Sequence, residues 1–135
     1  MITIVIPVYN SSDTIKETIN SVKNSTYKNW NCIIVNDGSI DNSEKIIEKE
    51  IKNDNRFYYI KTEHIGVANA RNIAIEKAKT EYIFPLDSDD LLEPKFLENA
   101  INYLLEHKNC IFYFGKWISF GMISGILSPN YKGYK

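Results

Sequence analysis

Three carboxylates follow an apolar segment at residues 86–90, whose sequence is LDSDD. Residues 82–86 are mostly large and apolar, which predicts a buried strand that ends at these carboxylates. An unpaired buried charge is costly, so carboxylates in this position need a partner. Mg²⁺ and Mn²⁺ prefer oxygen ligands and usually bind through one or two carboxylates together with substrate phosphates. The pattern therefore indicates a metal site for a ligand that contains a diphosphate.

The same carboxylates have a second interpretation. Asp89 or Asp90 could cap a helix predicted over residues 93–107, since Asp is a favoured N-cap and Pro94 suits a first helical turn. An Asp-x-Asp pattern also arises by chance. Taken alone, the pattern leaves both interpretations open.

The composition is that of a globular protein of one domain. The chain has 135 residues, of which 44% are hydrophobic and 24% are charged. Its 16 basic and 17 acidic residues give a net charge of -1. A nucleic-acid surface would show a basic excess, so we expect no nucleic-acid partner.

Cysteine usage and the N-terminal sequence favour a cytoplasmic location, which could include the inner face of the membrane. Cys32 and Cys110 lie in apolar segments without metal-ligand spacing, which favours free thiols over a disulfide. Residues 2–7 resemble a first strand rather than a signal peptide. The apolar residues 110–127 include Lys116 and three glycines, which favours a strand and loop over a membrane span.

Strand and helix patterns alternate along the chain. We expect strands over residues 2–8, 32–35, 57–60, 82–86 and 111–114, and helices over residues 12–24, 41–51, 67–79 and 93–107. This order predicts an α/β fold with a mostly parallel sheet and helices on both faces.

Polar clusters at residues 9–10, 36–39 and 87–89 follow three of the predicted strands. Ligands of such sheets bind outside the carboxyl ends of the strands, so we expect the clusters to form one site. Loops are polar in most proteins, but this does not explain why carboxylates follow two separate strands. The sequence lacks both a Gly-x-Gly-x-x-Gly after the first strand and a Gly-Lys-Ser/Thr, which argues against an NAD-type site and a P-loop.

Four segments together resemble the consecutive motifs of family 2 glycosyltransferases of the GT-A fold. They are residues 4–10 (IVIPVYN), 34–43 (IVNDGSIDNS), 66–72 (GVANARN) and 86–90 (LDSDD), with matching order and spacing from about residue 2 to 100. The resemblance implies a nucleotide-sugar-binding GT-A core over residues 1–108, with the start of an acceptor-side half over residues 109–135. It also implies a nucleotide-sugar donor, usually a UDP-sugar, a Mn²⁺ or Mg²⁺ cofactor, and inverting transfer to a glycan or lipid-linked acceptor in cell-surface polysaccharide synthesis.

The resemblance further implies roles for single residues. The nucleobase pocket would be lined by Pro7, Val8 and Tyr9, with Asp37 as acceptor for the base, Arg71 and Ser88 beside the nucleotide, Asp87 on the ribose and Asp89 on the metal. A carboxylate suits the N3–H of uracil, and a cation stabilises charge on the departing diphosphate. Each role has a structural alternative: Tyr9 as core rim, Asp37 in a turn, and Arg71 as a surface cation.

Three residues depart from the family pattern, and the mildest departure is Asn36, which replaces a frequent Asp. His64 stands where the family often has Asn, and Ile65 where it often has Gly. His64 has no Cys or carboxylate at ligand spacing, so we expect it to be a surface residue.

The last part of the sequence lacks carboxylates. Inverting transfer needs a general base, yet no Asp or Glu follows Glu106. We therefore expect the base beyond residue 135 and little or no transfer by this chain alone; the alternative is a truncated nucleotide-binding module without transferase activity. The apolar residues of 110–127 exceed what one strand would bury, which predicts self-association through this tail.

Overall fold

The computed structural model describes residues 1–113, 115, 117–119 and 125–127, the last two segments by their backbone only. Its internal contacts divide the chain into two compact units, Met1–Lys95 and Phe96–Lys135. The functional boundary that we expect after residue 108 stays a prediction.

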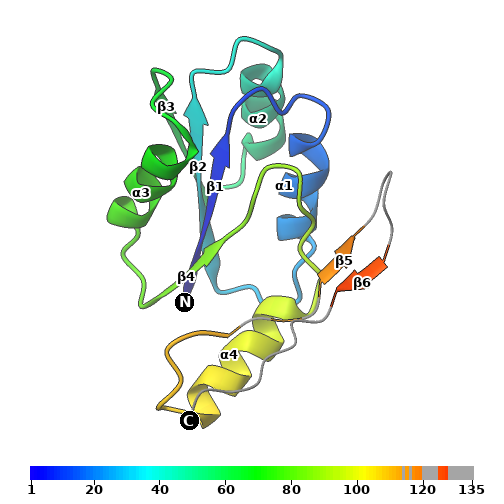
Figure 1. The fold of residues 1–135 in the computed structure, drawn as a ribbon, viewed down its shortest axis with the longest axis vertical. Coiled ribbons are helices and arrows are strands. Elements are labelled where there is room, and N and C mark those ends of the chain that lie inside the picture. The colour runs from blue at the N-terminus through cyan, green and yellow to red at the C-terminus, as the bar shows by residue number, and fades with distance from the viewer. Residues whose placement is uncertain (114, 116, 120–124, 128–135) are drawn as a thin grey trace. The chain divides into compact units, whose positions relative to one another are not determined.

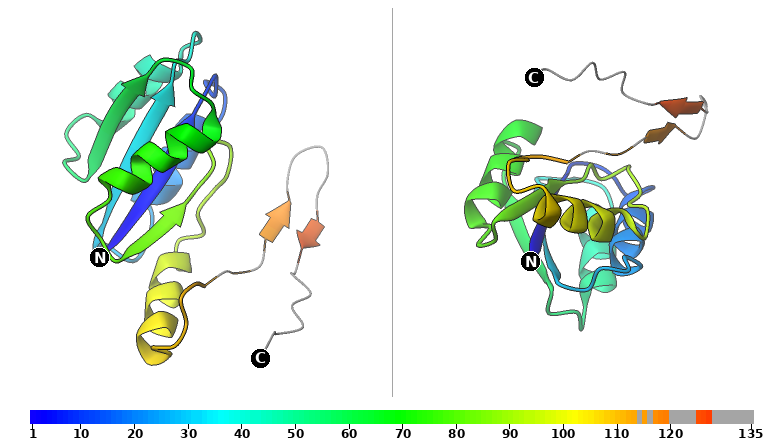
Figure 2. Two further views of the ribbon diagram at one scale, coloured as in Figure 1. Left: turned by 60° about the vertical axis from the view of Figure 1, so that its left-hand side comes forward. Right: turned by 90° about the horizontal axis from the view of Figure 1, so that it is seen from below.

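Strands and helices alternate through the first unit. Its elements are β1 (Ile2–Val8), α1 (Ile15–Lys23), β2 (Trp30–Asp37), α2 (Ser43–Ile51), β3 (Phe57–Thr62), α3 (Val67–Lys77) and β4 (Tyr82–Pro85). The four strands form one parallel sheet in the order β3-β2-β1-β4. Helix α3 covers one face of this sheet, and α1 and α2 cover the other (Figures 1 and 2). The predicted α/β fold, with a parallel sheet between helices, is confirmed.

The two central strands carry the core. Every residue of β1 is buried, and β2 is apolar from Cys32 to Val35, because helices cover both faces of the sheet. Helix α1 buries Ile15, Ile19 and Val22, which recur at the spacing of one helical face. These residues fix the strands whose ends carry the polar clusters.

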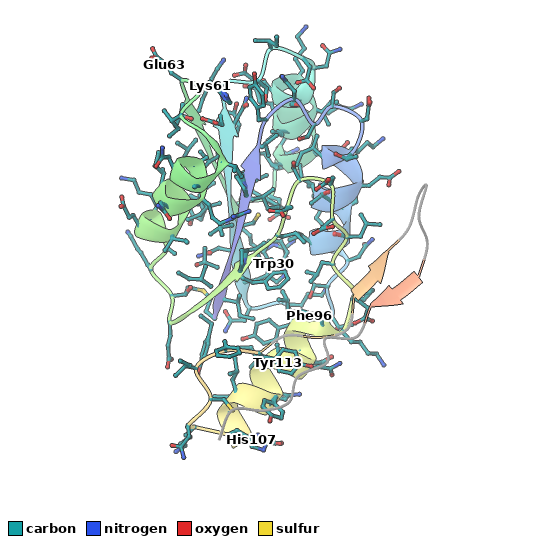
Figure 3. The ribbon with its side chains drawn as sticks, viewed as in Figure 1. Trp30, Lys61, Glu63, Phe96, His107 and Tyr113 are labelled. Atoms are coloured by element: carbon teal, nitrogen blue, oxygen red, sulfur yellow. The ribbon has the colours of Figure 1, made fainter. Side chains whose placement is uncertain are left out.

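All four strands end at the same edge of the sheet, because they are parallel. In the register between strands, Val8 lies opposite Asn36, and Asp37 lies opposite Thr62. Lys61 and Glu63 mark this edge in Figure 3, while Trp30 lies toward the opposite end. The loops after β1, β2 and β4 are therefore neighbours.

The second unit contains α4 (Phe96–Glu106) and an antiparallel pair, β5 (Trp117–Ser119) and β6 (Gly125–Leu127). The rings of Phe96 and Tyr103 each lie within 6 Å of the Tyr113 ring, at 5.7 and 5.6 Å between centroids. No helix in the described part of the chain is long and apolar enough to cross a membrane.

The strand predicted over residues 111–114 is wrong for residues 111–113, and residue 114 lies outside the described residues. The amide of Cys110 bonds the carbonyl of His107 in a turn after α4, and the next residues, Ile111 and Phe112, are exposed. Tyr113 then packs its ring on α4 instead of pairing its backbone with a strand. Much of the apolar tail lies outside the described residues, so its self-association stays a prediction.

Candidate functional site

A cavity of about 390 Å³ opens at the carboxyl ends of the strands. It is lined by Pro7, Val8, Tyr9, Asp37, Val67, Arg71, Asp87, Ser88 and Asp89. The structure thus brings together every residue to which the sequence analysis gave a nucleotide-binding or metal-binding role. The roles themselves stay predictions, but all of these residues line one cavity.

Asp37 ends β2 and has only 2% of its side chain exposed. Its Oδ1 accepts hydrogen bonds from the hydroxyl of Thr62 (3.1 Å) and the amide of Ile65 (2.8 Å). Its Oδ2 accepts one from the amide of Gly66 (2.9 Å). Burial raises the pKa of Asp37, but these bonds and the nearby His64 outweigh it, so the pKa lies below its usual value. Asp37 therefore stays ionised and ties β2 to the loop before α3.

His64 lies against the same carboxylate. Its Nδ1 is 3.1 Å from Oδ2 of Asp37, and its ring stacks on Tyr9 with 4.1 Å between centroids and 25° between planes. The prediction of a surface position is correct in that 57% of the side chain is exposed. The contact with Asp37 is not predicted from the sequence, because the two residues are far apart along the chain.

The loops after β1 and β2 hold each other. The amide of Asn10 donates to Oγ of Ser39 (3.0 Å), and the amide of Ile40 donates to Oδ1 of Asn10 (2.9 Å). Gly38, which directly follows β2, has a φ of 70°, and a Cβ at this position would lie 2.9 Å from the backbone nitrogen of His64. Only glycine fits both the left-handed conformation and this close approach.

The loop after β4 makes a tight turn, in which the amide of Asp90 donates to the carbonyl of Asp87 at 3.1 Å. Helix α4 begins only at Phe96, so neither Asp89 nor Asp90 is its N-cap. An Nη of Arg71 lies 2.5 Å from Oδ1 of Asp87. The Nε of Arg71 is buried and has no hydrogen-bond partner among the residues that the structure describes.

Ser88 is held by α1 and the loop before it. The hydroxyls of Thr14 and Thr18 each donate to the Ser88 carbonyl at 2.9 Å, and Oγ of Ser11 lies 2.7 Å from Oγ of Ser88. The backbone between Asp87 and Asp89 is therefore anchored, while the carboxylate of Asp87 stays largely exposed, at 55%.

The charges of this turn fit a cation. Burial raises the pKa of Asp90, and the negative charges of Asp89 and Asp87 raise it further, because like charges disfavour the ionised form of Asp90. Arg71 is paired with one of them. The described residues contain no group of three or more His, Cys, Asp or Glu side chains arranged to hold a metal by themselves. A divalent ion held by one or two carboxylates and substrate phosphates needs no such group.

Sequence reasoning missed Val67 as a lining residue. Val67 is the first residue of α3 and stands four residues before Arg71, so both lie on one helical face. That spacing is the signal that could have identified it.

Asp41 stabilises the loops after β1 and β2 through hydrogen bonds, and its lowered pKa makes this stabilisation depend on pH. Its carboxylate accepts hydrogen bonds from the backbone amides of Ser12 and Ser43, each at 2.9 Å. Burial raises the pKa of Asp41, but the bonds from Ser43 and Ser12 outweigh it and lower the pKa from 3.8 to about 2. Because the folded-state pKa is depressed, the stabilisation is present above the unfolded value and is lost as the pH falls toward 2.

We therefore expect Asp41→Asn to lower the free energy of unfolding by about 1–2 kcal/mol at pH 7. Urea denaturation of both proteins between pH 7 and about pH 2.5 measures the difference. The difference should hold down to about pH 4 and shrink below it. A difference in unfolding free energy that stays constant across this pH range would contradict the lowered pKa of Asp41 in the folded protein.

The family described as Glycosyl transferase family 2 matches residues 3–126. The chain belongs to glycosyl transferase family 2. This membership confirms the resemblance that the four motifs carry.

Relatives within family 2 include two from Streptococcus pneumoniae serotype 4 (strain ATCC BAA-334 / TIGR4). Glycosyltransferase GlyA is 33% identical over 125 residues, which cover 93% of this chain and 18% of GlyA. Glycosyltransferase GlyG is 36% identical over 107 residues, which cover 78% of this chain and 36% of GlyG. The chain thus spans a minor part of the length of these relatives.

Among solved structures, S. aureus TarS 1-349 is similar with a TM-score of 0.73 at 28% identity, over 79% of this chain and 33% of TarS. The same protein in complex with UDP-GlcNAc gives a TM-score of 0.74, with 79% of this chain and 32% of that chain covered. The mannosyltransferase PcManGT from Pyrobaculum calidifontis, at 24% identity and a TM-score of 0.70 over 76% of this chain and 32% of that chain, shares the fold. These likenesses confirm a GT-A-like fold for this family 2 chain.

Proposed function

We propose that the chain is the donor-binding part of an inverting glycosyltransferase that uses a UDP-sugar and Mn²⁺ or Mg²⁺. One observation carries this proposal: a single cavity has an aromatic ring and a buried carboxylate at Tyr9 and Asp37, and clustered carboxylates at Asp87 and Asp89. The similarity to TarS, which has been solved with UDP-GlcNAc, supports a uridine nucleotide.

The proposed role of each residue follows from the chemistry of the part of the nucleotide that it would contact. Tyr9 offers a ring face to a base, and Asp37 is an ionised acceptor for a base N–H. Asp87 would accept from ribose hydroxyls, and its partner Arg71 supplies positive charge beside an anionic ligand. Asp89, with Asp87 near it, would hold the metal, which stabilises the charge that develops on the departing nucleoside diphosphate.

The acceptor side is also part of the proposal. We place the general base outside the described residues, because no Asp or Glu follows Glu106 and the chain spans a minor part of its relatives. The acceptor would be a glycan or lipid-linked glycan of cell-surface polysaccharide, met in the cytoplasm or at the inner face of the membrane. The same features favour the second candidate, a nucleotide-binding module that transfers no sugar by itself.

Calorimetric titration with UDP, with and without Mn²⁺, tests the proposed function. We expect binding that is clearly tighter with Mn²⁺, because the ion offsets repulsion between the carboxylates and the diphosphate. UMP is the matched control ligand, since it lacks the second phosphate and should show a much smaller effect of Mn²⁺. Equal heat in both conditions, or none, would contradict the proposal.

A further inference from the structure

The imidazole of His64 makes both contacts that the proposed function assigns to the base. It stacks on Tyr9 at 4.1 Å between centroids, and its Nδ1 lies 3.1 Å from Oδ2 of Asp37. The same nitrogen is 3.2 Å from the backbone carbonyl of Asp37. His64 is therefore placed as a planar ring with a polar edge against an aromatic face and a carboxylate, which is how a base would be held.

The stacking leaves no space for a third ring. Aromatic rings in contact lie with centroids about 4.5–7 Å apart in offset or edge arrangements. A base between Tyr9 and His64 would need roughly twice the present separation of 4.1 Å. A base that stacks on this face of Tyr9 must therefore displace the histidine.

The carboxylate of Asp37 leads to the same conclusion. A carboxylate has about four acceptor positions. The hydroxyl of Thr62 and the amides of Ile65 and Gly66 belong to β3 and to the backbone before α3. The remaining contact comes from His64, whose side chain is 57% exposed. The exposed imidazole is the partner that a ligand can replace without disturbing the backbone.

We propose that His64 occupies the nucleobase subsite in the nucleotide-free protein and sets the affinity for the nucleotide by competing with the base. This inference rests on the proposed function. A protein that must first open its binding-competent state binds more weakly in proportion to the fraction that is open. His64 would thus act through its occupancy of Tyr9 and Asp37 and would leave the diphosphate end untouched.

Titrations of the wild type, His64→Ala and His64→Asn with UDP and with pyrophosphate, all with Mg²⁺, test the inference. One stacking contact and one hydrogen bond together correspond to about tenfold in affinity, so His64→Ala should bind UDP about tenfold more tightly. His64→Asn, which keeps a polar group but loses the ring, should also bind UDP more tightly. Pyrophosphate has no base, so its affinity should be the same for all three proteins.

The outcomes separate the two proposals. Unchanged or weaker UDP binding by His64→Ala, with UDP bound by the wild type, would overturn the role of His64 and leave the proposed function standing. Tighter binding of pyrophosphate as well as UDP would also overturn it, because the effect would not depend on the base. Absence of UDP binding by all three proteins would overturn both proposals.

Discussion

Asp89→Asn is expected to weaken UDP binding in the presence of Mn²⁺ by about 10- to 100-fold, the range that corresponds to loss of one interaction with a charged group. Asp89 lines the cavity in the turn that follows β4, and it is the residue proposed to hold the metal. Without Mn²⁺ the variant should bind UDP as the wild type does, or slightly more tightly, because one repelling charge is gone. Calorimetry at matched ionic strength measures both values.

Asp90→Asn is the matched control for this experiment. Asp90 belongs to the same turn and its charge interacts with those of Asp87 and Asp89, but it does not line the cavity. The substitution removes the same charge and keeps the same shape, while the backbone bond from its amide to Asp87 is unaffected. If Asp90→Asn loses as much Mn²⁺-dependent affinity as Asp89→Asn, the loss reflects the general effect of removing a charge and not the loss of a metal ligand at Asp89.

Asp37→Ala is expected to lower the free energy of unfolding by about 2–4 kcal/mol, because it removes a buried charged acceptor on which three donors converge. Those donors are the Thr62 hydroxyl and the amides of Ile65 and Gly66, which connect β3 to α3. Urea denaturation gives the change in unfolding free energy.

Asp37→Asn separates the structural role of Asp37 from its proposed role at the base. The amide keeps an oxygen for Thr62 and Ile65 but presents an NH₂ group to Gly66, so we expect an intermediate loss of stability. UDP should bind this folded variant more weakly than the wild type, while the effect of Mn²⁺ persists. An Ala variant as stable as the wild type would contradict the account of Asp37 as the tie between β2 and α3.

Much of the fold could be predicted because the first unit follows local rules. The run at residues 2–8 is apolar and β-branched except for Thr3 and Pro7, and it predicts a strand with the bounds that β1 has. Helix α1 was predicted from the spacing of Ile15, Ile19 and Val22. The predicted strand is wrong over residues 111–113 because apolar character does not specify a hydrogen-bonding partner, and Tyr113 contacts helix α4 instead.

The candidate site could be predicted because parallel strands bring their carboxyl ends together. That rule placed Tyr9, Asp37 and Asp89 at one edge, and the cavity contains all three. The contacts between loops could not be predicted in the same way. His64 reaches Asp37 because Gly38 lets the two loops approach closely, and no periodicity in the sequence encodes that approach.

A crystal structure of the chain with UDP and Mn²⁺ tests the central claim most directly, because the anomalous signal of manganese locates the ion independently of the nucleotide. We predict manganese within bonding distance of Asp89 and the diphosphate, with the uracil against Tyr9 and Asp37. Manganese at another carboxylate cluster, or a nucleotide bound outside the cavity at the strand ends, would contradict the account.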